Sequence, residues 1–142
     1  KQRGFCGIWT IPAPRMKANV EHRVPITAPM RELLRAMEAR EGLVFPAAYG
    51  HMLSDMTLSA LIKRLHLSDD GHFVDQRSQR PAVPHGLRST FRDWVAEHGK
   101  SREAAELQLA HKFGSAVEHA YYRADLLDER ARLMMQWFRF LN

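Results

Sequence analysis

Two short β-forming segments stand at the start of the chain, and helical periodicity accounts for most of the remaining residues. Residues 7–11 (GIWTI) and 22–26 (HRVPI) are rich in β-forming residues, and Pro25 indicates a sheet edge or a strand end. The polar connection PAPRMKANVE between them is long enough for a hairpin. This order predicts an α+β fold, with a small antiparallel hairpin over residues 1–26 and a mainly α-helical body over residues 27–142.

The predicted helices begin at residues that cap helices and are separated by glycines. Thr27 is a candidate N-cap with Pro29 in the first turn, and Asp125 is a candidate cap for the last helix. Ser115 and Glu118 form a capping box. We therefore expect helices over 28 to about 40–42, 57–67, 86–97, 102–112, 116–123 and 126–141, with a polar loop over 68–84.

Length and composition are those of one soluble domain. The chain has 142 residues, of which 45% are apolar and 26% charged, and no apolar run approaches the roughly 20 residues of a membrane span. Cys6 is the only cysteine, which excludes an internal disulfide and a Cys-rich zinc site and fits a reducing, cytoplasmic setting. Because the sequence begins at Lys1 and has no signal-peptide pattern, we expect a piece of a longer cytoplasmic protein.

The positive charge is concentrated near the start of the chain. The net charge is +5, and residues 1–40 hold eight Lys and Arg residues against three acidic ones, so the whole excess lies there. Such a basic stretch predicts a polyanionic partner such as nucleic acid. The alternative is a solvated basic face without a partner.

Most small functional motifs are absent, and one weak motif is present. The chain has no GxGxxG, no GxxxxGK[ST] and no HExxH, so we expect no nucleotide cofactor and no metal, and His66 with His72 is a weak metal pair. His85 and Arg88 are three residues apart at a predicted helix start, on one face. An imidazole and a guanidinium beside a helix N-terminus form an anion site.

Three longer segments resemble the motifs of the tyrosine recombinase family, in particular the phage-type integrases of prophages and genomic islands. VPHGLRSTFRDWVAEHG is similar to the family's second-arginine box, H-x-x-R followed by a T-F helix. LQLAHKFGSAVEHAYYRADLLDERARLMMQWFRFL is similar to its histidine and tyrosine boxes, which run into the C-terminal helix. IWTIPAPRMKANVEHRVPIT resembles its hairpin with the catalytic lysine. The resemblance covers nearly the whole chain in the right order.

The resemblance implies site-specific DNA recombination, in which a strand is cut and rejoined through a 3′-phosphotyrosine. It assigns the nucleophile to Tyr121 in the A-Y-x-R context, with Tyr122 as the minority candidate. The remaining catalytic roles fall on Lys17 as general acid, His85 as base, Arg88 as the second phosphate arginine and His111 as the later phosphate-contacting histidine. Double-stranded DNA is the implied partner, with Arg15, Arg23 and Arg92 as candidates for contact with backbone phosphates.

Other interpretations stay open. The family's first arginine precedes the hairpin, so we expect this chain to be the C-terminal portion of a catalytic domain that lacks it. A DNA-binding fragment or degenerate integrase without catalysis is therefore the alternative. A type IB topoisomerase and a helical protein-interaction domain fit the motifs less well. The apolar stripe of helix 126–141 predicts packing on its own core, or docking onto another integrase protomer.

Overall fold

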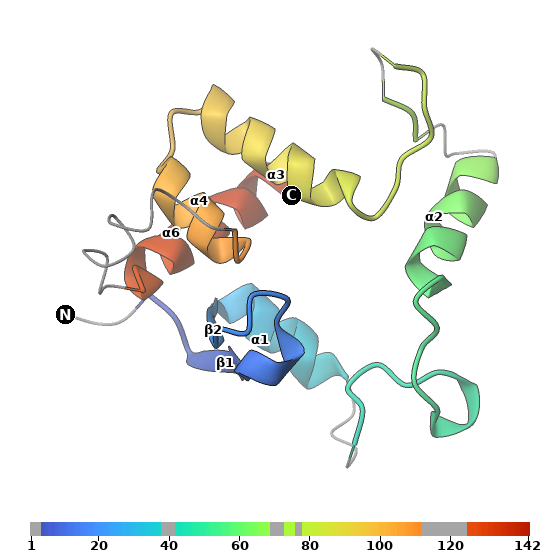
Figure 1. Ribbon diagram of the computed structural model, residues 1–142. Helices are drawn as coiled ribbons and strands as arrows, with labels where there is room; N and C mark the ends of the chain where they lie inside the picture. The colour runs from blue at the N-terminus through green and yellow to red at the C-terminus, as the bar shows by residue number, and fades with distance from the viewer. Residues whose placement is uncertain (1–3, 38–41, 69–72, 76–77, 112–124) are drawn as a thin grey trace. The chain divides into compact units, whose positions relative to one another are not determined.

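The computed structural model describes residues 4–37, 42–68, 73–75, 78–111 and 125–142 (Figure 1). Its contacts divide the chain into two compact units, Lys1–Met37 with Arg92–Asn142, and Glu38–Phe91. The first unit therefore joins the two ends of the chain. The prediction that residues 1–142 form a single domain stays a prediction.

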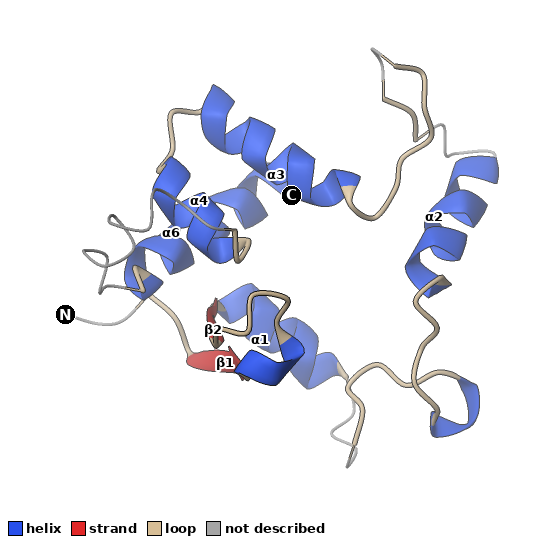
Figure 2. Ribbon diagram, in the orientation of Figure 1, coloured by secondary structure: helices blue, strands red, loops and turns tan. Residues whose placement is uncertain are grey.

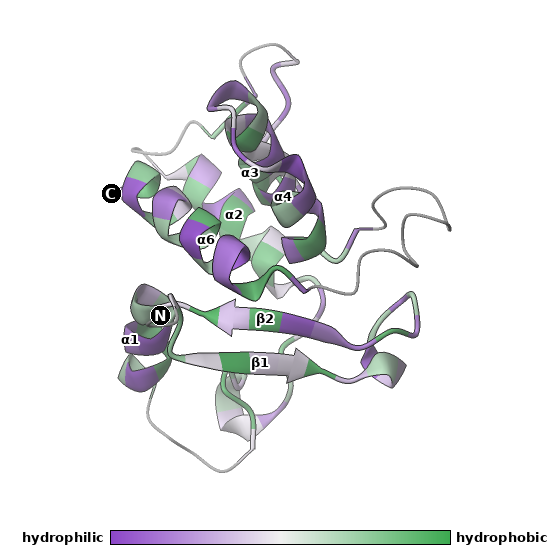
Figure 3. Ribbon diagram, turned by 90° about the vertical axis from the view of Figure 1, so that its left-hand side faces the viewer, coloured by the Kyte–Doolittle hydropathy of each residue, from purple (hydrophilic) through white to green (hydrophobic). Residues whose placement is uncertain are grey.

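An antiparallel hairpin opens the first unit, as predicted. β1 (Gly7–Ile11) pairs with β2 (His22–Ile26) in a register that sets Gly7 opposite Ile26 and Ile11 opposite His22 (Figure 3). A short 3-10 helix, η1 (Ala13–Arg15), lies in the connection. Both strands have the predicted bounds, so their β-forming residues were sufficient to predict where each strand begins and ends.

Helices make up most of the remaining described chain, which confirms the α+β class (Figure 2). The elements of the second unit include η2 (Ala48–Gly50) and α2 (Thr57–Leu67), and α2 has the predicted bounds. The helix α3 (Gly86–Glu97), also as predicted, crosses the boundary between the units. The first unit also contains α1 (Ala28–Ala36), α4 (Arg102–Gln108) and α6 (Leu127–Leu141).

Two helices end earlier than predicted. α1 starts at the N-cap position Thr27, but it stops at Ala36 because Met37 is extended, with ψ of 117°. Met37 is also the last residue of the helix's apolar stripe, so further turns would bury nothing. α4 ends at Gln108, where residues up to 112 were expected, because Ala110 takes a left-handed φ of 54°. The predicted helix 116–123 lies outside the described residues.

The start of α6 also differs from the prediction. Its N-cap is Leu126, with a left-handed φ of 46°, and no side chain caps it. Asp125 was the predicted cap, but its carboxylate instead accepts a hydrogen bond from Arg23 on β2. The Asp125 carboxylate therefore binds Arg23, a cation distant in sequence, and does not accept from the first N–H groups of the helix.

The core of the first unit lies where α6 meets α4 and β2. Its buried apolar residues include Val24 on β2, Ala104 and Ala105 on α4, and Ala131 and Leu133 on α6. On the second half of α3, Trp94 is 4% exposed and packs in a tilted arrangement against Trp137 of α6, with ring centroids 5.1 Å apart. Small residues on α4 let the helices approach closely, while large aromatic rings fill the space beside α3.

The helices that the structure describes include none long and apolar enough to span a bilayer.

Candidate active-site residues

His85 and Arg88 lie together at the start of α3. His85 is exposed and immediately precedes the helix, and Arg88 is half-buried in its first turn. The Arg88 N–H donates to the His85 carbonyl over 3.1 Å, which fixes the two residues in one turn. The two residues therefore lie in one turn at the positive end of the helix dipole, as predicted, and their role as an anion site stays a prediction.

His111 lies in the first unit, directly after α4, and its position is set by a Schellman motif. The Ala110 N–H donates to the Leu107 carbonyl, and the His111 N–H donates to the Glu106 carbonyl over 2.9 Å. The left-handed Ala110 makes this reversal possible. The chain therefore turns back at the end of α4 and returns His111 to the side of Glu106.

Glu106 holds His111 a second time, through its side chain. Its Oε2 lies 2.7 Å from His111 Nδ1, and its Oε1 accepts from Arg92 Nε over 2.9 Å and forms an ion pair with Arg92 Nη2, also at 2.9 Å. Glu106 is only 7% exposed. Arg92, predicted to contact DNA, thus pairs with a buried carboxylate in the structure, and its contact with phosphate stays a prediction.

Lys17 and Arg15 lie in the connection between the strands. Arg15 ends η1, and Lys17 occupies the next turn, which the Asn19 N–H closes by donating to the Met16 carbonyl. Both side chains are exposed. They are therefore placed where a polyanion can reach them from solvent.

Arg23, the third candidate for phosphate contact, pairs with Asp125. Its Nη1 lies 2.9 Å from Asp125 Oδ2, with the two side chains 40% and 42% exposed. The pair connects β2 to the segment that leads into α6. Its contact with DNA also stays a prediction.

Arg130, which no sequence motif singled out, is the most deeply buried charged residue described. It is 1% exposed and donates to Gln108 Oε1, to the Asp125 carbonyl and to the Arg23 carbonyl. Burial lowers the pKa of Arg130, the Asp125 carboxylate raises it, and the Arg23 cation lowers it. The amphipathic pattern of α6 gave no sign of this role, because two of the three acceptors, on Gln108 and Arg23, lie 22 and 107 residues away in sequence.

The structure brings together only part of the predicted constellation. His85 with Arg88 belongs to the second unit, while Lys17 and His111 belong to the first. Tyr121 and Tyr122 lie outside the described residues. The assigned roles of these residues therefore stay predictions.

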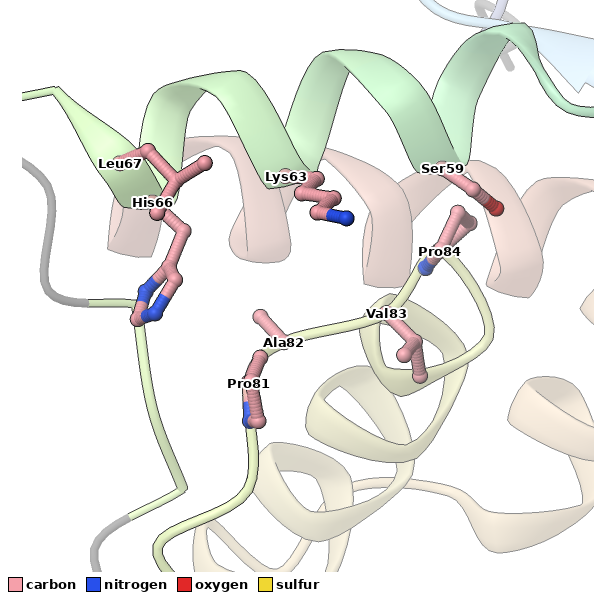
Figure 4. Close-up of a pocket in the computed structure, with 8 residues that line it drawn as sticks. All are labelled: Ser59, Lys63, His66, Leu67, Pro81, Ala82, Val83 and Pro84. Carbon is pink, nitrogen blue, oxygen red and sulfur yellow. The ribbon is translucent and has the colours of Figure 1, made fainter.

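A cavity of about 280 Å³ lies within the second unit, between α2 and residues 81–84 (Figure 4). Ser59, Lys63 and His66 contribute from α2, facing Pro81 and Pro84. The His66 Nδ1 is buried without a hydrogen-bond partner in the described structure. No group of three potential metal ligands occurs among the described residues, and His72 lies outside them.

Comparison with known proteins decides the family. The model of the phage integrase family matches residues 4–127. The chain belongs to the phage integrase family. This confirms the family that the sequence motifs predicted, and all the predicted catalytic residues lie inside the matched region.

Individual relatives agree. The integrase chain is 33% identical over 135 residues to the prophage integrase IntA of Escherichia coli strain K12, covering 92% of the chain and 30% of that protein. It is 30% identical over 150 residues to the integrase of Enterobacteria phage P4, covering 92% of the chain and 32% of that protein. A 58-residue stretch is 44% identical to the integrase of Shigella phage Sf6. The chain thus spans about a third of the length of the first two relatives, and no solved structure matches it.

Proposed function

We propose that this chain is the C-terminal portion of the catalytic domain of a site-specific DNA recombinase, which integrates or excises mobile DNA. The observation that carries the proposal is the phage integrase match over residues 4–127, within which Lys17, His85, Arg88, His111 and Tyr121 all lie. The local pairing of His85 with Arg88 at the positive end of α3 supports it, because a phosphodiester is an anion.

In the proposed reaction, the Tyr121 oxygen attacks the scissile phosphorus. A new phosphorus–oxygen bond forms to Tyr121 as the bond to the 5′-oxygen breaks. His85 accepts the tyrosine proton, and Lys17 gives a proton to the departing 5′-oxygen. The products are a 3′-phosphotyrosine and a free 5′-hydroxyl.

Positive charge and hydrogen-bond donors lower the barrier to this attack. Arg88 offers a planar fork that fits two phosphate oxygens, and His111 donates to a non-bridging oxygen. Because the phosphate ester is preserved on the enzyme, a second 5′-hydroxyl can attack it and reverse the step. Strand joining then needs no nucleotide hydrolysis.

Double-stranded DNA is the proposed substrate, and its exposed basic contacts include Arg15 and Lys17 on the hairpin connection. A second protomer is the proposed partner at the end of α6. At this end the exposed apolar side chains are those of Phe138, Phe140 and Leu141, which are 42%, 55% and 60% exposed. Residues packed in a helical core would be buried, so these side chains are available to a partner. Phe138→Ser with Leu141→Ser should reduce self-association on DNA in sedimentation, and unchanged association would contradict the proposed protomer contact.

DNA binding without catalysis is the competing function, because exposed basic residues such as Arg15 and Lys17 are also what binding to backbone phosphates alone requires. The test uses the chain extended by its upstream residues and a nicked duplex, from which a cleaved end can diffuse away. A denaturant-resistant protein–DNA band that Tyr121→Phe removes and Tyr122→Phe retains would support catalysis. Salt-sensitive binding without such a band would favour the DNA-binding alternative.

A further inference from the structure

Glu106 is a buried carboxylate whose two oxygens are both committed. Oε1 accepts from Nε of Arg92 on α3 and forms an ion pair with its Nη2, and Oε2 lies 2.7 Å from Nδ1 of His111. The side chain is 9% exposed, against 48% for Arg92 and 34% for His111. A charge removed from water in this way is tolerated only when it is paired and hydrogen-bonded.

The contact fixes which ring nitrogen of His111 carries a proton. A carboxylate only accepts hydrogen bonds, so a nitrogen at 2.7 Å from Oε2 must be the donor, and the proton lies on Nδ1. Any contact of His111 with a phosphate is then made through Nε2, and because a phosphate oxygen only accepts, Nε2 must also carry a proton in that contact. The ring cannot exchange its two nitrogens without breaking this bond.

The backbone adds a second constraint on the same residue pair. The His111 N–H donates to the Glu106 carbonyl over 2.9 Å, so backbone and side chain of His111 both bind Glu106. Arg92 holds the other carboxylate oxygen from the neighbouring helix, which keeps the Glu106 side chain from rotating. The imidazole is thereby oriented before any substrate binds.

We propose that Glu106 is a positioning residue for the recombinase reaction, which holds His111 with its proton on Nδ1 and presents Nε2 to the scissile phosphate. This inference rests on the proposed function for its consequence in catalysis. Arg92 acts one step further away, by orienting the Glu106 carboxylate. Glu106 itself touches no reacting atom.

The variants separate this role from a structural one. Glu106→Met keeps the length of the side chain and its fit in a helix but removes the acceptor, whereas Glu106→Gln keeps an oxygen that can accept from Nδ1. Glu103→Met, in the first turn of the same helix, removes the same charge as a matched control. Thermal unfolding of each variant checks that the fold is retained.

The first measurement is the ring nitrogen spectrum of the 15N-histidine-labelled chain, with the His111 signals assigned from His111→Gln. We expect a proton on Nδ1 in the wild type, in Glu106→Gln and in Glu103→Met, whether or not Nε2 is protonated as well, and a shift toward a ring protonated on Nε2 alone in Glu106→Met. A wild-type His111 protonated on Nε2 alone would overturn the proposal without any variant. An unchanged His111 in Glu106→Met would overturn it as well.

The second measurement is single-turnover formation of the covalent adduct on the nicked duplex, with the upstream residues present. Glu106→Met should slow it by about tenfold or more, as loss of an orienting partner does elsewhere, with DNA affinity unchanged. In a His111→Ala background it should add no further loss, and an equal loss there would show a structural role and overturn the proposal. If the wild type forms no adduct, the proposed function fails, while the ring spectrum still decides the role of Glu106.

Discussion

Replacing Arg130 is the perturbation whose effect on stability the structure defines best. The guanidinium is 1% exposed and connects three elements, through Gln108 on α4, the carbonyl of Arg23 on β2 and the carbonyl of Asp125 before α6. Arg130→Met keeps most of the side-chain volume but leaves all three acceptors without their donor.

The expected loss depends on the number and type of these bonds. Hydrogen bonds to a charged group contribute about 1.5–3 kcal/mol each, and the three are not additive because they share one cation. Relief of the desolvation that lowers the pKa of Arg130 offsets part of the loss. We therefore expect the free energy of unfolding to fall by about 3–5 kcal/mol, the range for breaking a buried charged network.

Urea unfolding followed by circular dichroism measures this difference directly. The matched control is Arg132→Met, two residues along the same helix and exposed, for which we expect a change within about 0.5 kcal/mol. Arg130→Lys should fall between the two, since an ammonium group cannot reproduce the planar set of donors. Equal losses for Arg130→Met and Arg132→Met would refute the role assigned to Arg130.

Three further predictions concern single contacts. The side chains of the Arg23–Asp125 ion pair are 40% and 42% exposed. A double-mutant cycle with Arg23→Gln and Asp125→Asn should therefore give a coupling free energy of about 0.2–1 kcal/mol. The absence of coupling would contradict the pair. Ala110→Gly should raise the unfolding free energy by about 1 kcal/mol, because Ala110 has a left-handed φ of 54°. Ala104→Gly inside α4 should lower it by about 1 kcal/mol or more. Changes of the same sign would refute the left-handed conformation assigned to Ala110. DNA affinity should fall steeply with salt, and Arg15→Gln should reduce the log–log slope by about 0.9 if Arg15 neutralises one phosphate, while an unchanged slope would exclude that contact.

Elements with strong local patterns were predicted well. The bounds of β1, β2, α2 and α3 agree with β-forming runs and helical periodicity, both of which depend on residues close in sequence. The end of α4 was missed because an alanine, where a glycine was expected, takes the left-handed position of the Schellman motif. Local contacts between Glu106 and His111 stabilise that turn, and helical periodicity does not report them.

In the candidate site, too, an arrangement of residues close in sequence could be predicted, whereas a contact between distant residues could not. The pair of His85 and Arg88 could be predicted because it lies within one turn. Glu106 was missed, although the spacing E-x-x-x-x-H across a helix end was a signal that could have marked it. The partner of Asp125 is 102 residues away on β2, so a short-range capping rule assigned its carboxylate to the wrong donor.

The identity of the covalently attached residue tests the account most directly. Trypsin should release residues 113–123 from the trapped adduct as one peptide that contains both Tyr121 and Tyr122. After nuclease digestion, fragmentation in a mass spectrometer locates the remaining nucleotide. The account predicts a nucleotide joined through its 3′-phosphate to Tyr121. A nucleotide on Tyr122, or an adduct on any other residue, would contradict the proposed nucleophile and the mechanism built on it.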